Sequence, residues 1–349
     1  MTAKEARIAV YGAGAMGTVL GAFLTERGLN VDLITRNEAH VFGLREKGAV
    51  IELTADGGEK IIKVNALFPY EMEGEYDVIF LMTKQRKNGE ILEGLLPYLK
   101  SDGVVCTTQN GLPEESVANV VGQERTYGAA TSFGATFLGG GRVALTSNLS
   151  AMRMQIGSYE NDGAKLPLLK EILSVMGNRD NDGFVEVEEN LLGARWSKLS
   201  INAAFSGLSV VTGMTFGEVA KKRKTRKLAL GILRECMDVA NASGVKLAPM
   251  QGHDLEKLLG GRTGIKRFVS YMVLPFAIKK HKNLVSGMLK DVQNGRKCEI
   301  EFINGAVVAA GRRVGVPTPL CEKVVALTND IENGLCEIDY RNVDFFNEL

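Results

Sequence analysis

The 349-residue sequence predicts an α/β fold, in which an N-terminal Rossmann-type domain is followed by an all-helical C-terminal domain. Three observations support this prediction. A glycine-rich loop lies near the N-terminus, between a short apolar segment and a helix-forming one. Short apolar runs then alternate with helical stretches, which is typical of βαβ units and a parallel sheet. From about Glu188 onward, apolar residues recur at helical spacing to the end of the sequence.

The first elements surround the glycine loop. Strands are predicted at Arg7–Tyr11, Asn30–Thr35, Asp77–Thr83 and Gly103–Thr107, because each is a short apolar run bounded by turn residues. A helix is expected over Met16–Arg27, ending at Gly28, since glycine tolerates the positive φ that follows many helices. This alternation places the strands in one parallel sheet.

The composition of the sequence changes after about Gly122. Residues 127–159 are rich in Gly, Ser and Thr, and we expect them to add strands, partly antiparallel, that complete the same sheet. The helical half begins near residues 184–188, so the predicted domains are 1–186 and 187–349. Long helical segments are expected at Leu191–Val211, Thr225–Ala242, Lys266–His281 and Ile300–Val314.

Composition excludes several classes of function. Lys plus Arg number 42 against 41 Asp plus Glu, so no bulk charge favours nucleic acid. The one dense basic run, Lys221–Lys227, is expected to be an exposed helix turn. No apolar run approaches the ~20 residues that span a bilayer, and no membrane partner is expected.

The cysteines and histidines indicate a reduced, metal-free protein. The five cysteines are scattered without C-x-x-C spacing, and the polar N-terminus does not resemble a secretory leader. We therefore expect free thiols and a cytoplasmic location. The three histidines lie far apart in the sequence, and no metal site is predicted.

The glycine loop is Gly12-Ala13-Gly14-Ala15-Met16-Gly17. In a dinucleotide-binding loop the first glycine permits a tight turn, and the second lets the backbone approach the pyrophosphate. The third allows close packing of strand and helix, whose positive end faces the phosphates. The predicted cofactor-binding residues here are Gly12, Gly14, Ala15, Met16 and Gly17.

The residue at the end of the second predicted strand indicates whether the cofactor is NAD or NADP. Arg36 stands 19 residues after Gly17, where NAD-binding proteins usually carry a carboxylate for the ribose hydroxyls. A guanidinium at this place can bind a 2′-phosphate in a forked geometry. Asp32 lies earlier, inside the predicted strand, and is the poorer ribose ligand. The sequence therefore favours NADPH/NADP+ over NAD.

A second group of polar residues lies in the helical half. Lys198 and Asn202 are four residues apart in a predicted helix, on one face, and Ser206 continues the stripe. Taken alone, the stripe is compatible with an exposed face of an amphipathic helix. Buried among the neighbouring apolar residues, each of these groups would need a partner.

Further motifs lie along the rest of the chain. Beyond the glycine loop they are, in order, Lys84, Asn110-Gly111, Trp196, Lys198, Asn202, Asn283, Ser286, Asp291, Glu299, Asn304-Gly305 and Thr318-Pro319. With these motifs the sequence resembles the ketopantoate reductase (2-dehydropantoate 2-reductase) family, and the resemblance extends over essentially the whole chain.

The resemblance implies a helical domain like the C-terminal domain of 6-phosphogluconate dehydrogenase, with the active site in a cleft. It also implies NADPH-dependent reduction of a 2-keto acid to a 2-hydroxy acid. The favoured substrate is 2-dehydropantoate, reduced to pantoate in pantothenate and coenzyme A biosynthesis. Lys198 would be the general acid, and Glu299 would hold Lys198 and the product hydroxyl.

The resemblance assigns the other site residues as well. Asn283 and Ser286 would bind the substrate carboxylate, and Asn202 would complete the polar lining. Arg36, Lys84 and Asn110 would contact the cofactor.

One substrate residue departs from the family. Ser206 stands where the family usually has a second Asn on the catalytic helix, and Gly207 follows it rather than Pro. The shorter serine would leave a roomier pocket, so another 2-keto acid, or an imino acid as in opine dehydrogenases, is an alternative substrate. A non-catalytic NADP-binding regulator is a further alternative. The role of residues 253–281, the role of the tail and the oligomeric state stay open, with a homodimer as one option.

Overall fold

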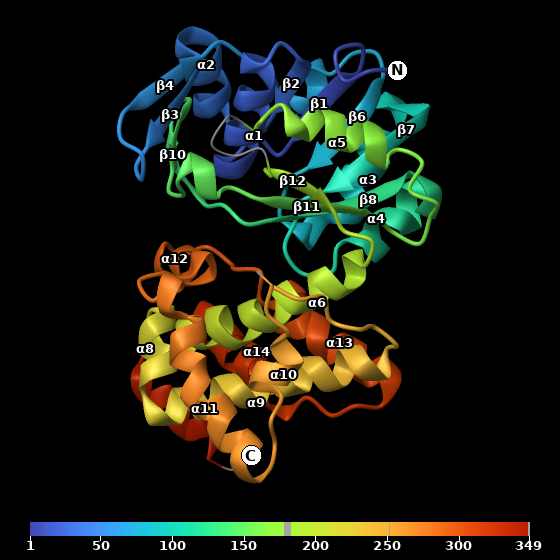
Figure 1. The fold of residues 1–349 in the computed structure, drawn as a ribbon. Helices are drawn as coiled ribbons and strands as arrows, with labels where there is room; N and C mark the ends of the chain where they lie inside the picture. Colours follow the sequence, from blue (N-terminus) through green and yellow to red (C-terminus); the bar gives the residue numbers. More distant parts are fainter. Residues whose placement is uncertain (178–182, 251, 348–349) are drawn as a thin grey trace. The chain divides into compact units, whose positions relative to one another are not determined.

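A computed structural model describes residues 1–177, 183–250 and 252–347. The chain divides into two compact units (Figure 1). The first comprises Met1–Gln109 and Pro113–Leu191, and the second comprises Asn110–Leu112 and Leu192–Leu349. Apolar clusters fill the interior of each unit.

The N-terminal unit is built on a mostly parallel sheet. Its strands in the described residues are β1 (Arg7–Tyr11), β2 (Asn30–Ile34), β5 (Asn65–Leu67), β6 (Tyr76–Leu81), β7 (Leu99–Thr107), β8 (Thr126–Thr131), β11 (Met154–Ser158) and β12 (Val185–Val187). Their order across the sheet is β12-β11-β8-β7-β6-β1-β2-β5. From β8 to β5 every neighbouring pair is parallel, whereas β11 runs antiparallel to β8. The predicted Rossmann-type architecture is confirmed.

Helices cover both faces of this sheet (Figure 1). They are α1 (Ala15–Glu26), α2 (Glu38–Lys47), α3 (Asn88–Leu95), α4 (Glu114–Val121) and α5 (Leu166–Ser174). The start of α2 is set by Asn37, whose side chain accepts a hydrogen bond from the His40 N–H at 2.9 Å. Its end is set by Gly48, where φ is 81°.

A second, smaller sheet was not expected. It contains β3 (Ala49–Leu53), β4 (Glu59–Ile62), β9 (Ala135–Gly139) and β10 (Arg142–Leu145), in the order β4-β3-β10-β9. The prediction that residues 127–159 complete one sheet is therefore right for β8 and β11 and wrong for β9 and β10. The reason is α1, which packs on the main sheet through β1 and β2 and on the small sheet through β3, β9 and β10. Its wide apolar surface needs a cover on both sides.

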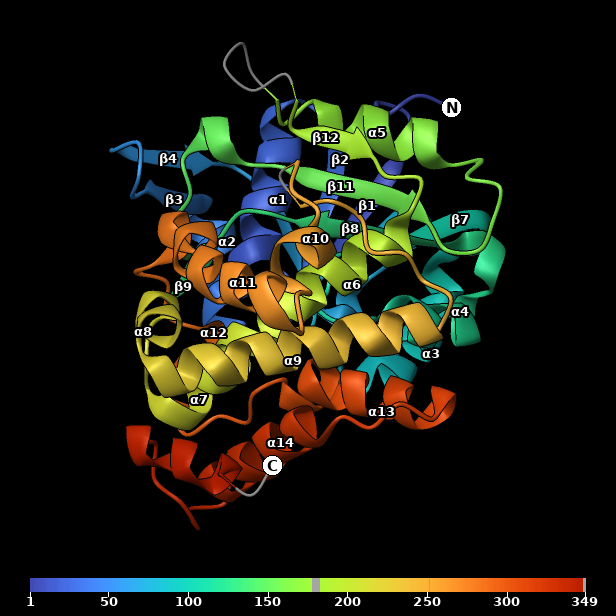
Figure 2. The same cartoon turned by 60° about the horizontal axis from the view of Figure 1, so that its bottom comes forward.

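The second unit is helical. Its α-helices in the described residues are α6 (Leu191–Ile201), α7 (Gly207–Thr212), α8 (Phe216–Lys221), α9 (Arg223–Ala242), α10 (Leu255–Leu259), α11 (Gly264–Ala277), α12 (Gly287–Gln293), α13 (Asn304–Val314) and α14 (Pro319–Glu332). Figure 2 shows α9 running through the unit, with α11 on one side and α13 and α14 on the other, and α9 contacts all three.

Three predicted helices of this unit are interrupted. Leu191–Val211 is not one α-helix, because a π-helical turn at Asn202–Ser206, called the π turn below, separates α6 from α7. The segment expected at Lys266–His281 ends as a helix at Ala277 and continues as a 3₁₀ turn. The segment expected at Ile300–Val314 begins with a 3₁₀ turn before α13.

The basic run 221–227 spans the junction between α8 and α9. Lys221–Lys224 are exposed, as expected for a solvated turn. Arg226 is partly buried, and its guanidinium carbon lies 4.5 Å from the ring centre of Tyr271 on α11, in a cation–π contact.

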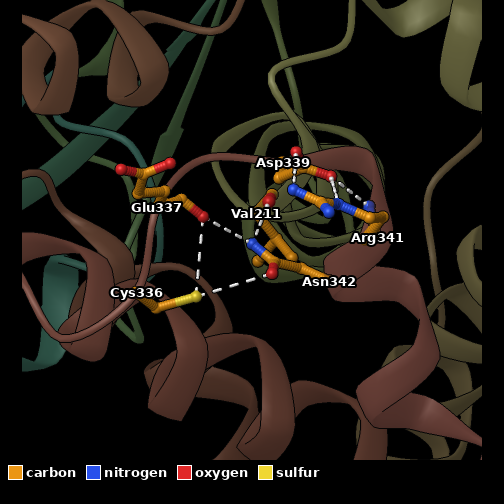
Figure 3. A network of polar contacts seen from close by, with 6 residues as sticks. All are labelled: Val211, Cys336, Glu337, Asp339, Arg341 and Asn342. Atoms are coloured by element: carbon orange, nitrogen blue, oxygen red, sulfur yellow. Dashed lines mark hydrogen bonds and ion pairs between the residues drawn. The ribbon is translucent and has the colours of Figure 1, made fainter.

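The C-terminal tail packs against α7 through a 3₁₀ helix, Tyr340–Phe346 (Figure 3). Asn342 is buried, and its side-chain amide donates to the carbonyl oxygens of Val211 at 2.9 Å and Glu337 at 2.8 Å. The Cys336 thiol lies 3.5 Å from the amide oxygen of Asn342. The tail thus secures the end of the helical segment that begins at α6. Its last two residues lie outside the described residues.

Candidate active site

The glycine loop connects β1 to α1, and its three glycines have different environments. At Gly12 φ is 104°, and a Cβ atom would lie 2.6 Å from the backbone nitrogen of Thr83. At Gly17 a Cβ would lie 2.4 Å from the carbonyl oxygen of Gly12. The nearest atom to a Cβ at Gly14 is 4.0 Å away, so the loop is open there. Gly12 and Gly17 therefore serve the turn and the packing of α1, and Gly14 leaves room for a ligand.

The N-terminus of α1 follows this open position. Gly14 is its N-cap, Ala15 and Met16 form its first turn, and no acidic residue stands in that turn. The aligned peptide dipoles make this end electropositive, and no neighbouring carboxylate within the turn neutralises it. An anionic group is stabilised at such a helix end.

A cavity of about 430 Å³ adjoins the loop and is lined entirely by the N-terminal unit. Gly12 and Gly14 line one part of it. Its cationic lining residues are Arg36, Lys84, Arg86 and Lys87. The lining, all of it in the described part of the chain, includes no Asp or Glu. Such a cavity favours a polyanionic ligand.

Arg36 is exposed two residues beyond the end of β2. Its charge reaches Tyr11, another lining residue: burial raises the pKa of the Tyr11 hydroxyl, and Arg36 opposes this shift. Arg86 and Lys87 were not among the predicted site residues. The signal that could have revealed them is the basic sequence that begins at Lys84.

Asp32, the carboxylate of β2, is engaged elsewhere. Its side chain is buried and accepts hydrogen bonds from Arg7 at 3.1 Å, Asn65 at 2.6 Å and Tyr76 at 2.7 Å. These three bonds occupy both carboxylate oxygens. Asp32 therefore ties β2 to its surroundings and does not line the cavity.

The segment that carries Lys84 is held by a buried amide pair. The Gln109 side-chain nitrogen donates to the Thr83 carbonyl at 2.8 Å and to the Asn88 side-chain oxygen at 2.7 Å. Asn88 donates in return to Gln109 at 3.0 Å. Gln109 and Asn88 were not among the predicted site residues, since neither belongs to a motif. Asn110 follows Gln109 directly and is exposed.

In the helical unit, the predicted polar stripe surrounds the π turn. Lys198 on α6 and Asn202, the first residue of the turn, are half-buried, and Ser206, its last residue, is buried. The intervening residues of the turn, 203–205, are completely buried. The stripe is therefore a partly enclosed polar row, rather than an exposed face.

Ser286 is brought toward this row. It is buried, and its hydroxyl caps α12 by accepting the Met288 N–H at 3.1 Å. Because α12 packs against the π turn, Ser286 belongs to the same part of the unit. Asn283 is exposed three residues upstream, and the half-buried Glu299 precedes a 3₁₀ turn that packs on α13 and α14.

Within the described residues, no three His, Cys, Asp or Glu side chains come together as metal ligands. None of the described helices combines the length and the apolar character required to cross a membrane.

Comparisons with known proteins match both halves of the chain. The family model described as "Ketopantoate reductase PanE/ApbA" matches residues 8–161. The model described as "Ketopantoate reductase PanE/ApbA C terminal" matches residues 190–332.

Curated relatives agree with these models. The 2-dehydropantoate 2-reductase of Streptococcus pyogenes serotype M18 is 25% identical over 321 residues, which are 92% of this chain and 96% of the relative. The 2-dehydropantoate 2-reductase of Pyrococcus horikoshii is 24% identical over 317 residues, 90% of this chain and 93% of the relative.

Solved structures share the fold. A PanE/ApbA family ketopantoate reductase from Ralstonia eutropha JMP134 superposes with a TM-score of 0.77 at 24% identity, covering 94% of this chain and 99% of that one. D-mandelate dehydrogenase in a ternary structure with NADH and anilino(oxo)acetate gives 0.78 at 23% identity, with coverage of 94% and 99%. At these identities the likeness establishes the architecture of both units.

Proposed function

We propose, because this chain belongs to the ketopantoate reductase family, that it reduces a 2-keto acid to a 2-hydroxy acid with NADPH, and that 2-dehydropantoate is its substrate. Membership of this family supports the assignment of the chain as an oxidoreductase that acts on a 2-keto acid and depends on a nicotinamide cofactor. The observation that carries the choice of NADPH is the cationic cavity beside the glycine loop.

The cavity fits the phosphorylated adenosine end of NADPH. A 2′-phosphate carries about two negative charges, and Arg36 and Lys84 both line the cavity into which it would extend. Arg86 and Lys87 add further positive charge. The carboxylate that would repel a phosphate, Asp32, is buried in bonds to three other side chains. Gly14 and the first turn of α1 would receive the pyrophosphate.

When bound, the reduced nicotinamide supplies a hydride to the ketone carbon. The protein must then stabilise the negative charge that develops on the ketone oxygen. Lys198 is proposed to donate a proton to that oxygen, and Glu299 to orient Lys198 and the product hydroxyl. Asn283 and Ser286 are proposed to bind the substrate carboxylate. Asn202 and Asn110 complete the set, with Asn110 also contacting the cofactor.

A second candidate is the reduction of a different 2-keto acid, and Ser206 favours it. A serine offers one donor on a short side chain, whereas an asparagine offers two donors on a longer one. A substrate without a distal hydroxyl would lose less binding energy when serine replaces asparagine at this position. The homodimer and the cytoplasmic location predicted from the sequence stay predictions.

The test is a matrix of two cofactors and several substrates. Purified protein would be given NADPH or NADH with ketopantoate, pyruvate, 2-oxoisovalerate or phenylglyoxylate, and cofactor oxidation would be followed by absorbance. We expect the highest kcat/KM with NADPH and ketopantoate. A preference for another keto acid would select the second candidate. Tight NADPH binding without turnover of any keto acid would instead support a regulator, and a preference for NADH would overturn the cofactor assignment.

A further inference from the structure

The helix that carries Lys198 changes its hydrogen-bonding pattern about one turn after that residue, at Asn202. Between α6 and α7, the N–H of Gly207 donates to the carbonyl oxygen of Asn202, five residues earlier, as in a π-helix. Such turns are rare inside α-helices and are frequent at functional sites. A feature of the surrounding unit must therefore stabilise this one.

Asn304, the first residue of α13, provides the contact. Its side-chain amide nitrogen donates to the carbonyl oxygen of Ala203 inside the π turn, at 3.1 Å. In an α-helix this carbonyl would instead accept the N–H of Gly207. Asn304 is completely buried, and its amide oxygen accepts no hydrogen bond from the described residues. A buried amide that leaves one polar atom unsatisfied is costly, so its retention here calls for a reason.

Gly207 makes the space for this amide. A Cβ atom at Gly207 would lie 2.7 Å from the side-chain oxygen of Asn304 and 2.8 Å from Cγ1 of Val324. Any larger residue would displace Asn304 or widen the contact with α14. The glycine that follows Ser206 is thus part of the same arrangement.

The π turn changes where Ser206 points. At 3.6 residues per turn, each step of four residues rotates a side chain by about 40°, so an unbroken α-helix would place Ser206 roughly 80° from Lys198. A turn closed by i→i+5 bonds has roughly 4.4 residues, so four residues within it rotate backward by about 30°. The two rotations nearly cancel. Lys198 and Ser206 then lie within roughly 10° of each other around the helix axis, with Asn202 about 40° to one side.

We propose that Asn304 is a positioning residue, which stabilises the π turn through Ala203 and thereby aligns Lys198, Asn202 and Ser206 in one row. The proposal rests on the proposed function, because the row matters for catalysis only if these side chains act on the substrate. The hydrogen-bond geometry of the turn can be measured independently of activity.

The main test uses Asn304→Leu, which keeps the approximate volume and removes the donor. The matched control is Thr328→Val on α14, since Thr328 is also fully buried and its hydroxyl has no hydrogen-bond partner in the described residues. For N304L we expect kcat/KM for the keto acid to fall on the order of 10²-fold, with KM for NADPH unchanged. T328V should retain both values. Equal losses in the two variants, or unchanged kinetics in folded N304L, would overturn the proposal.

A double-mutant cycle separates alignment from general destabilisation. Ser206→Ala should reduce kcat/KM in the wild-type background and have little further effect in N304L, because Ser206 is then already out of line. Independent, multiplicative losses would contradict the proposal. If N304L does not fold, Gly207→Ala disturbs the same contact from the other side and takes its place in the cycle.

Hydrogen–deuterium exchange gives the readout that does not need turnover. Amide exchange over residues 199–210 should accelerate in N304L and remain unchanged in T328V. If the wild-type protein reduces no keto acid, the proposed function fails, and this comparison still decides whether Asn304 holds the turn. Unaltered exchange over these residues in N304L would show that it does not.

Discussion

His40 and Thr18 join α2 to α1 through a hydrogen bond of 2.9 Å between the imidazole Nε2 and the threonine hydroxyl. On the other side of the ring, the Gly141 N–H donates to Nδ1 at 3.1 Å. Because Nδ1 accepts, the neutral imidazole carries its hydrogen on Nε2 and donates to Thr18. Burial lowers the pKa of His40 from 6.5 to about 4. One neutral histidine thus connects the helix after the glycine loop with the small sheet.

This arrangement predicts a loss of stability in acid. The folded protein binds the His40 proton more weakly than the unfolded chain, so the contribution of His40 is fully present above pH 6.5 and is lost as the pH falls toward 4. The shift corresponds to about 3 kcal/mol over that interval. Urea unfolding between pH 7 and pH 4 should show a shallower dependence on pH in His40→Gln than in the wild type. His253→Gln, at an exposed site, is the control; identical pH profiles for H40Q and wild type would refute the assignment.

The substitution Arg36→Ala should weaken the binding of NADPH more than the binding of NADH. A charge-assisted hydrogen bond contributes about 1.5–3 kcal/mol, so KM for NADPH should rise roughly 10- to 100-fold. KM for NADH, which has no 2′-phosphate, should change little. Initial rates with both cofactors measure the effect, and Arg223→Ala, at an exposed site in the helical unit, is the control. A parallel rise of KM for both cofactors would argue against a 2′-phosphate contact.

Lys198→Ala should abolish most turnover and leave cofactor binding intact. A positioned general acid contributes about 10²- to 10⁴-fold, and kcat should fall by that order. NADPH affinity, measured by fluorescence titration, should stay within about twofold, because the cationic cavity is lined entirely by the N-terminal unit. Lys290→Ala on the exposed surface of α12 controls for the loss of one positive charge. Comparable losses of kcat and of NADPH affinity in K198A would count against its role as the acid.

Asn342→Ala should destabilise the protein. It removes two hydrogen bonds of a buried amide and leaves the Val211 and Glu337 carbonyls without that donor, at a cost of about 1–3 kcal/mol. Arg341→Ala is the matched control in the same tail, because its ion pair with Asp339 is solvent-exposed and contributes little. Thermal unfolding of both variants checks this. A Tm for N342A as high as that of R341A would show that the tail does not stabilise α7.

Local patterns were sufficient to predict much of the N-terminal unit. The strand at Arg7–Tyr11, the loop glycines and Arg36 follow one another within a single βαβ unit, where sequence spacing determines spatial order. The small sheet could not be predicted in this way. Its central pair joins β3 to β10 across about 90 residues of sequence, and the residues of neither strand indicate which strand it pairs with.

The helical site shows the same limit. Lys198, Asn202 and Ser206 are spaced as in an ordinary α-helix, so the π turn cannot be detected from their periodicity. What distinguishes it is Asn304, 101 residues beyond Ala203. Gln109 and Asn88 escaped prediction for a related reason, since their contribution is to hold Thr83 and not to meet a ligand.

The buried position of Asp32 constrains any redesign of cofactor preference. In this protein the strand carboxylate is a tie between β2, Arg7, Asn65 and Tyr76. On the proposed preference for NADPH, a redesign toward NADH could not recruit that carboxylate without breaking these three hydrogen bonds. A new acidic residue would have to be introduced at Arg36 itself, and Arg86 and Lys87 would then have to be neutralised in the same variant. Evolution from the proposed NADPH preference to the use of NADH would require the same set of coordinated substitutions.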